Sequence, residues 1–292
     1  MTIKRLRIIE LVVFFAAASS VAAQTPPPPL SVKPLRGGVY WTQGGVGGNT
    51  GIIIGRNGVI IIDAKTTPDS AKEMLSAVAK LTDKPVTHVI LTHSDADHVN
   101  GLAAFPKGLT IIAHENNKKE QEAALAAGGP AAPPRDYLPN QVVAKDKESL
   151  KIDGVRIVLL HFAPAHTSGD LIVFLPDQKI VFAGDITATN HPFPFIHLDK
   201  NGSSEGWIKS AKGIAALDAD TFVPGHGDLQ TKADVQKRLA DTAERRAQIK
   251  ELVAQGKSLD EIRKTLGDTE NPPPGGAYRP FTEVVYKELS KN

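Results

Sequence analysis

The 292-residue chain contains no cysteine. No disulfide can therefore stabilise it, and no thiolate is present to act as a metal ligand or a nucleophile. Aromatic residues make up only 5% of the sequence, and the formal net charge is only +2. Lys4, Arg5 and Arg7 against Glu10 account for that whole surplus within residues 1–23. Because the rest of the chain has no basic excess, we expect no binding of nucleic acid or of an anionic membrane.

The N-terminus also lacks an apolar run of the ~20 residues that a membrane span needs. It has instead the three parts of a secretory signal: a basic stretch, a short apolar stretch and the small-residue motif Val21-Ala-Ala23. We therefore predict a cleavable signal peptide over residues 1–23, a secreted or periplasmic location, and no stable membrane anchor afterwards. Four consecutive prolines follow, so residues 24–34 are predicted to form an extended spacer.

Apolar strands alternate with amphipathic helices along the rest of the chain. Residues 51–54 and 59–63 are predicted to form a β-hairpin, because Asn57-Gly58 between them is a strong turn signal. Residues 69–81 carry apolar side chains at helical spacing, and strand pairs followed by helices recur in the second half. This order predicts an α/β fold in which helices cover sheets. Residues 233–292 are predicted to form a C-terminal helical extension.

Potential metal ligands gather where the predicted strands end. Residues 86–91 form an apolar, β-branched run typical of a buried strand, and four potential ligands follow it directly. Three more follow other strands, each beside a turn that contains Gly or Pro. Strand ends are rigid and the loops after them can turn, so imidazoles and carboxylates from these positions can meet at one point. The seven candidates are His93, Asp95, Asp97, His98, His166, Asp185 and His226.

The order of these motifs resembles the signature of the metallo-beta-lactamase superfamily. Here it reads Thr92-His-Ser-Asp-Ala-Asp-His98, Pro164-Ala-His-Thr-Ser-Gly169, Gly184-Asp185 and Pro224-Gly-His-Gly227. The resemblance implies a four-layer αβ/βα sandwich over residues 35–232, with a two-metal site at the edge where the two sheets meet. The implied ligands of the first metal are His93, Asp95 and His166, those of the second are Asp97, His98 and His226, and Asp185 would bridge both.

Asp95 stands where most of that family has histidine. A carboxylate in place of an imidazole should make the first position less selective for zinc and more tolerant of iron or manganese. It could also weaken this position enough to leave an enzyme with one metal.

The resemblance implies a hydrolase with two divalent metal ions, zinc in the first place and iron or manganese as alternatives. A metal-bound hydroxide, oriented by Asp97 as the catalytic residue, would attack an ester, thioester, lactone, lactam or phosphoester bond of a small molecule. Three alternatives stay open. One is β-lactamase activity specifically, and another is an iron-dependent oxidoreductase acting on a thiol or persulfide, which Asp95 motivates. The third is a non-catalytic metal-binding module, which seven well-placed ligands disfavour.

Other polar and aromatic residues have two interpretations each. The segment after Asp185 either lines an apolar substrate pocket or packs as an ordered loop, and its candidate residues are His191, Phe193, Phe195 and His197. Asp63 ends a strand, so it either supports a metal ligand or starts a turn. His88, His114 and His161 lack the turn context of the candidate ligands and are predicted to be structural.

Overall fold

A computed structural model describes residues 28–129, 132–270 and 278–290 of the chain. The predicted signal peptide lies outside the described residues. Within the described part, no helix is both long and apolar enough to cross a membrane.

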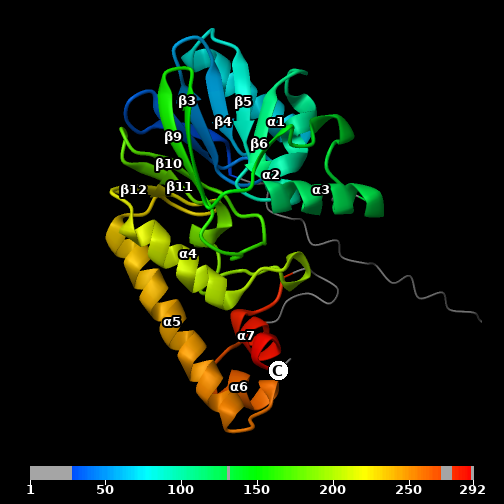
Figure 1. Ribbon diagram of the computed structural model, residues 1–292, viewed down its shortest axis with the longest axis vertical. Helices are drawn as coiled ribbons and strands as arrows, with labels where there is room; N and C mark the ends of the chain where they lie inside the picture. Colours follow the sequence, from blue (N-terminus) through cyan, green and yellow to red (C-terminus); the bar gives the residue numbers. More distant parts are fainter. Residues whose placement is uncertain (1–27, 130–131, 271–277, 291–292) are drawn as a thin grey trace, which may run out of the picture.

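The first half of the chain forms a seven-stranded sheet (Figure 1). Its strands follow one another in sequence order, antiparallel from β1 to β4 and parallel from β4 to β7. The predicted hairpin over Asn57-Gly58 is confirmed, because β3 pairs with β4 across that turn. The strands are β1 (Ser31–Pro34), β2 (Val39–Gln43), β3 (Thr50–Ile54), β4 (Val59–Ile62), β5 (Val86–Ile90), β6 (Thr110–His114) and β7 (Gln141–Val143).

The second half forms a five-stranded sheet in the order β12-β11-β10-β9-β8. Strands β8 to β11 are a meander of antiparallel neighbours, and β12 adds to β11 in parallel. The strands are β8 (Lys147–Ile152), β9 (Val155–Leu160), β10 (Ile172–Leu175), β11 (Ile180–Phe182) and β12 (Thr221–Val223).

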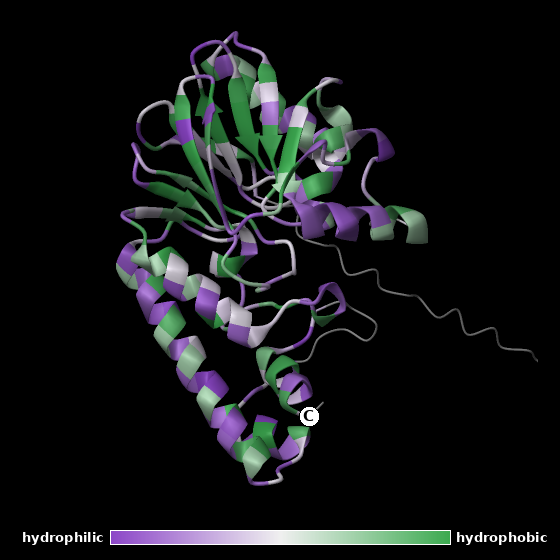
Figure 2. Cartoon of the chain, viewed as in Figure 1, coloured by the Kyte–Doolittle hydropathy of each residue, from purple (hydrophilic) through white to green (hydrophobic). Residues whose placement is uncertain are grey.

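Three apolar cores hold four layers together. One core lies between the sheets, where Ile60 and Ile90 of the first sheet share a cluster with Val173 and Phe182 of the second. A second joins the outer face of the first sheet to α1 (Pro68–Leu81), and a third joins the second sheet to α4 (Ser204–Ala216). Hydrophobic colour therefore concentrates on the strands in Figure 2. The predicted αβ/βα sandwich is confirmed.

The remaining helices of the sandwich connect its strands along the chain. They are α2 (Ala96–Val99), α3 (Glu115–Ala127) and the 3-10 turns η1 (Asn100–Ala104), η2 (Arg135–Tyr137), η3 (Gly184–Thr187) and η4 (Leu198–Lys200).

The predicted spacer is wrong for residues 31–34, because these residues form β1. They pair with β2 from Ser31 opposite Gln43 to Pro34 opposite Tyr40. Proline has no N–H group to donate to a neighbouring strand. Because β1 is an edge strand and Pro34 is its last residue, no strand on its outer side loses a hydrogen bond.

The predicted C-terminal helices are present as α5 (Lys232–Ala254), α6 (Leu259–Leu266) and α7 (Phe281–Leu289). The chain runs away from the sandwich along α5 and returns through α7 (Figure 1). Phe281, Val284 and Val285 of α7 are buried in the core that also contains Trp207 of α4. The extension therefore packs onto the second sheet's helical layer and is part of the same core.

His114 has a structural role at the start of α3. Its Nδ1 accepts a hydrogen bond from the backbone N–H of Asn116 at 3.2 Å, and its ring stacks on His161 at 4.1 Å between centroids. Burial and the neighbouring His161 lower the pKa of His114 to about 4.

The low pKa of His114 predicts acid sensitivity. As the pH falls from about 6.5 to about 4, the unfolded chain binds a proton at this residue before the folded protein does, so the folded state loses stability over that window. His114→Asn keeps an acceptor for the helix cap but cannot titrate. We expect the melting temperature of this variant to fall less between pH 7 and pH 4.5 than that of the unmodified chain. Parallel pH profiles of the two proteins would contradict this account.

Candidate metal centre

The seven predicted ligands lie together at one edge of the sandwich. Four come from the loop after β5 and from α2, which begins at Ala96. The other three come from the connection between β9 and β10, from η3 after β11 and from the loop after β12. Residues as far apart in sequence as His98 and His226 thus face each other, with their Nε2 atoms 3.3 Å apart. The structure brings together all seven.

Their ligand atoms form three overlapping groups, and within each group the atoms lie within 4.8 Å of one another. His166 Nε2 is 3.0 Å from Asp95 Oδ2, and His226 Nε2 is 2.9 Å from Asp97 Oδ2. His98 Nε2 is 3.4 Å from Asp185 Oδ1. The groups are His93 with Asp95 and His166, Asp97 with His98 and His226, and His93 with His98 and Asp185.

Two atoms of this cluster are buried without a hydrogen-bond partner. They are His93 Nε2 and Asp185 Oδ1. A buried polar atom left unsatisfied costs about 1–3 kcal/mol, so native sites rarely keep one without a reason. Metal ions bound between these side chains would satisfy both atoms, so the residues present fit such ions.

The charges of the cluster point the same way. Burial lowers the pKa of His98, but the carboxylates of Asp97 and Asp63 outweigh it and raise that pKa to about 10. Burial also lowers the pKa of His166, but the carboxylate of Asp95 outweighs it and raises that pKa to about 10. The carboxylates therefore attract positive charge strongly. A bound divalent cation supplies such charge, and it is often the largest local charge in a site of this kind.

Asp63 supports a metal ligand, as one of its two interpretations predicts. Its backbone is left-handed, at a φ of 63°. Its Oδ2 also accepts a hydrogen bond from His98 Nδ1 at 2.8 Å, and its two oxygens accept from the N–H and hydroxyl groups of Thr92. A carboxylate on the far nitrogen fixes the orientation of a ligand histidine and raises its basicity.

Asn49 connects the glycine-rich loop of residues 44–51 to the segment that carries His226. Its side-chain amide donates to the carbonyls of Pro224 at 2.9 Å and Gly227 at 3.0 Å, and its backbone N–H donates to Gly225. The buried Lys65 holds the same loop by donating to the carbonyls of Gly44 and Gly48. The loop over residues 44–51, which has the composition of a flexible segment, is thus anchored on both sides.

Glycine is required at two positions of this region. A Cβ atom at Gly48 would collide with the ring of His98, and one at Gly225 would collide with Asp185 Oδ1. The backbone at these two positions therefore lies directly against the ligand side chains.

Asp95 has more partners than the other two carboxylates. Its Oδ2 accepts from His166 Nε2 and from His197 Nε2, both at 3.0 Å. Its Oδ1 accepts from Lys200 Nζ at 2.5 Å. His197, predicted as a pocket residue, therefore contacts a candidate ligand directly.

The other predicted pocket residues divide into two groups. Phe195 packs against His166 with 5.4 Å between ring centroids, and His191 stacks on Tyr278 at 4.3 Å. Phe193 instead stacks on Phe281 of α7, so it joins the core of the extension. Phe193 thus packs as the ordered-loop interpretation predicts. The pocket interpretation of the other residues stays a prediction.

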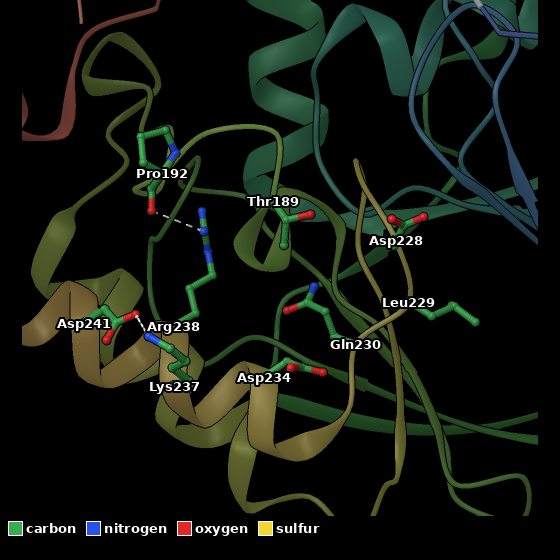
Figure 3. A pocket seen from close by; sticks show the side chains of 9 residues that line it. All are labelled: Thr189, Pro192, Asp228, Leu229, Gln230, Asp234, Lys237, Arg238 and Asp241. Atoms are coloured by element: carbon green, nitrogen blue, oxygen red, sulfur yellow. Dashed lines mark hydrogen bonds and ion pairs between the residues drawn. The ribbon is translucent and has the colours of Figure 1, made fainter. Parts of the chain in front are cut away.

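A cavity of about 370 Å³ lies behind the His226 loop (Figure 3). Arg238 of α5 reaches across it and donates to the carbonyls of His191 and Pro192, at 3.2 and 3.4 Å. Thr189 on its wall donates its N–H to the carbonyl of His226 at 3.0 Å. The helical extension thereby holds in place the segment after Asp185 that contains His191 and Pro192. The lining residues are Thr189, Pro192, Asp228, Leu229, Gln230, Asp234, Lys237, Arg238 and Asp241.

Sequence reasoning missed Asn49, Lys65, Lys200 and Arg238. Each acts through a contact with a residue that is distant in the sequence, and no local motif marks it.

Comparisons with known proteins agree with the geometry. The family model described as the metallo-beta-lactamase superfamily matches residues 43–226. The alpha subunit of 2,4-dinitroanisole O-demethylase from Nocardioides sp. (strain JS1661) is 28% identical over 68% of this chain and 57% of its own length. Linear primary-alkylsulfatase from Pseudomonas sp. (strain ATCC 19151) is 22% identical over 78% of this chain and 51% of its own length. The chain thus spans little more than half of these relatives.

Solved structures share the fold. A sec-alkylsulfatase from Pseudomonas sp. superposes with a TM-score of 0.67 and 16% identity, over 90% of this chain and 50% of its own. A metallo-beta-lactamase from Pontibacter korlensis gives 0.62 and 19%, over 74% of this chain and 99% of its own. Residues 1–232 are only about four fifths of the chain, so the alkylsulfatase match includes part of the helical extension.

The support that Asn49 gives to His226 can be tested by substitution. Asn49→Ala removes two hydrogen bonds from the His226 loop, and we expect the affinity for zinc to fall by about 10–100-fold, the usual cost of losing such a support. Competition with a chromophoric chelator measures this affinity. Asn57→Ala, in the exposed turn between β3 and β4, is the matched control. Equal affinities of the two variants would show that Asn49 does not position a ligand.

Proposed function

Because the chain belongs to the metallo-beta-lactamase superfamily, we propose that it is a metal-dependent hydrolase with two divalent ions, preferably zinc, at the candidate metal centre. One observation carries the proposal. Seven imidazole and carboxylate side chains converge from the ends of both sheets. Two of their atoms, in His93 and Asp185, are buried without a hydrogen-bond partner. Iron or manganese would suit the carboxylate-rich ligand set as alternatives.

Bound divalent ions would activate a water molecule as the nucleophile and polarise the reacting oxygen of the substrate. Asp97 is the carboxylate placed to move a proton. Its side chain is 36% exposed, against 12% for Asp95 and 9% for Asp185. Burial would raise its pKa, but His98 and His226 hold that pKa well below its usual range. Asp97 therefore stays ionised and can accept a hydrogen bond from the water, which orients it. As a weak base it would hold the proton only briefly before releasing it to solvent.

The proposed substrate is a small molecule with an ester, thioester, lactone, lactam or phosphoester bond and an apolar group. The position of Phe195 is the reason to expect an apolar group on the substrate, because its half-buried ring packs against the candidate ligand His166. The named activities of the relatives add sulfate esters to the bonds that deserve a test. The complete group of Asp97, His98 and His226 favours hydrolysis over the alternative of an iron-dependent oxidoreductase, since a one-iron site would leave that group without a role.

Activity and metal binding can be tested together. Asp97→Asn keeps the shape of the side chain and removes its charge, so we expect turnover to fall by about 10²–10⁴-fold while the melting temperature stays close to that of the unmodified chain. The assay is a panel of the bonds above with zinc restored. Asp69→Asn, on the exposed start of α1, is the control. A fully active Asp97→Asn variant, or turnover that persists after chelation, would refute the proposal.

We also propose that residues 1–23 are removed on export and that the mature protein acts in the periplasm or outside the cell. The composition of the N-terminus supports this proposal. Intact mass analysis of protein from a secreting host should give a mature N-terminus at Gln24. A chain that keeps its first 23 residues would contradict it.

A further inference from the structure

We propose that the two metal positions differ in affinity, and that Lys200 causes the difference by weakening the position formed by His93, Asp95 and His166. This position is called the Asp95 position below, and the position of Asp97, His98 and His226 is called the Asp97 position. The inference rests on the proposed function, because it assumes that the centre binds metal.

Lys200 already pairs with Asp95, the carboxylate that a metal at the Asp95 position would need as a ligand. Its ammonium lies 2.5 Å from Asp95 Oδ1, and the two side chains are only 24% and 12% exposed. Partly buried ion pairs are screened much less than surface pairs. The ammonium therefore compensates much of the carboxylate charge, and it repels a second cation nearby.

The other oxygen of Asp95 is shared as well. Nε2 of His166 and Nε2 of His197 both approach Oδ2 at 3.0 Å. A metal at this position has to replace these contacts before it gains the carboxylate. Of the three ligand side chains, only His93 offers a buried nitrogen with no hydrogen bond to displace, since its Nε2 lies 3.7 Å from Asp95 Oδ2.

Lys200 is held in place. Its Nζ also donates to Ser94 Oγ at 3.0 Å, and Ser94 donates in turn to Glu120 Oε2 at 2.6 Å. Glu120 Oε1 accepts from the N–H and hydroxyl groups of Ser168, so the carboxylate is fixed too. This chain of hydrogen bonds keeps the ammonium against Asp95 when a metal arrives.

The Asp97 position has the opposite environment. Among the described residues, neither Asp97 nor Asp185 forms an ion pair with a lysine or an arginine, and their ion-pair partners are histidines. The buried Lys65 also interacts electrostatically with Asp97, but its ammonium donates its hydrogen bonds to the carbonyls of Gly44 and Gly48. The carboxylate of Asp63 lies 2.8 Å from His98 Nδ1, which strengthens this imidazole as a ligand. A negative charge thus supports the Asp97 position, whereas a positive charge opposes the Asp95 position.

The expected behaviour is stepwise loading. When metal is scarce the chain should hold one ion, at the Asp97 position, and the second ion should join only at higher free metal. The occupancy of the Asp95 position would then follow the metal supply of the compartment.

Zinc titration of the full, metal-depleted chain against a chromophoric chelator tests the proposal. We expect two affinities in the unmodified chain. Lys200→Met should tighten only the weaker step, by about tenfold or more, because the freed Asp95 carboxylate then needs a cation. Lys200→Arg keeps the charge and should keep the weak step. Lys107→Met, which removes an exposed lysine paired with Asp136, is the matched control and should change neither step.

Asp63→Asn provides the complementary variant. It keeps an acceptor for His98 but removes the charge, so it should weaken only the tighter step, by about 10–100-fold. Two equal affinities, or a weaker step that Lys200→Met leaves unchanged or loosens, would overturn the inference and leave the proposed function intact. A chain that binds no zinc at all would instead refute the proposed function.

Discussion

Negative charge confined to one sheet edge is the constraint on which this site depends. Asp95, Asp97 and Asp185 surround the same imidazoles, and only Asp97 has substantial access to solvent. Carboxylates in such a place need positive charge, because water cannot solvate them fully. Without metal, His98 and His166 meet that need by holding protons, because the neighbouring carboxylates raise their pKa values. The same electrostatics makes the cluster a receptor for divalent cations.

The fold supplies rigidity to this cluster by placing the ligands on loops and short helical turns that follow strands. The apolar core between the sheets fixes the strand ends, and short loops then aim the side chains. Contacts between distant segments complete the arrangement, as Asn49 does for the His226 loop and Asp63 does for His98. The helical extension contributes from the other side, since Arg238 holds the segment that contains His191. The candidate centre is therefore shared by both sheets and supported by the extension.

The sequence predicts this site well wherever the signal is local. His93 to His98 follow an apolar strand, and the Pro224-Gly-His-Gly227 turn marks His226, so their convergence follows from the strand pattern. Contacts across the chain leave no such mark. Lys200 lies 105 residues from Asp95, and Asn49 lies 175 residues from Pro224. Strand β1 escaped prediction for a different reason: it is short, ends in a proline and follows a run of prolines, as a spacer would, and only pairing with β2 makes it a strand.

Anomalous X-ray diffraction from crystals of the zinc-loaded chain tests the central claim most directly. The account predicts two zinc peaks bounded by the seven side chains, one beside His93 and His166 and one beside His98 and His226, with Asp185 between them. Zinc bound only at other places on the surface, with the seven side chains still paired among themselves, would contradict it.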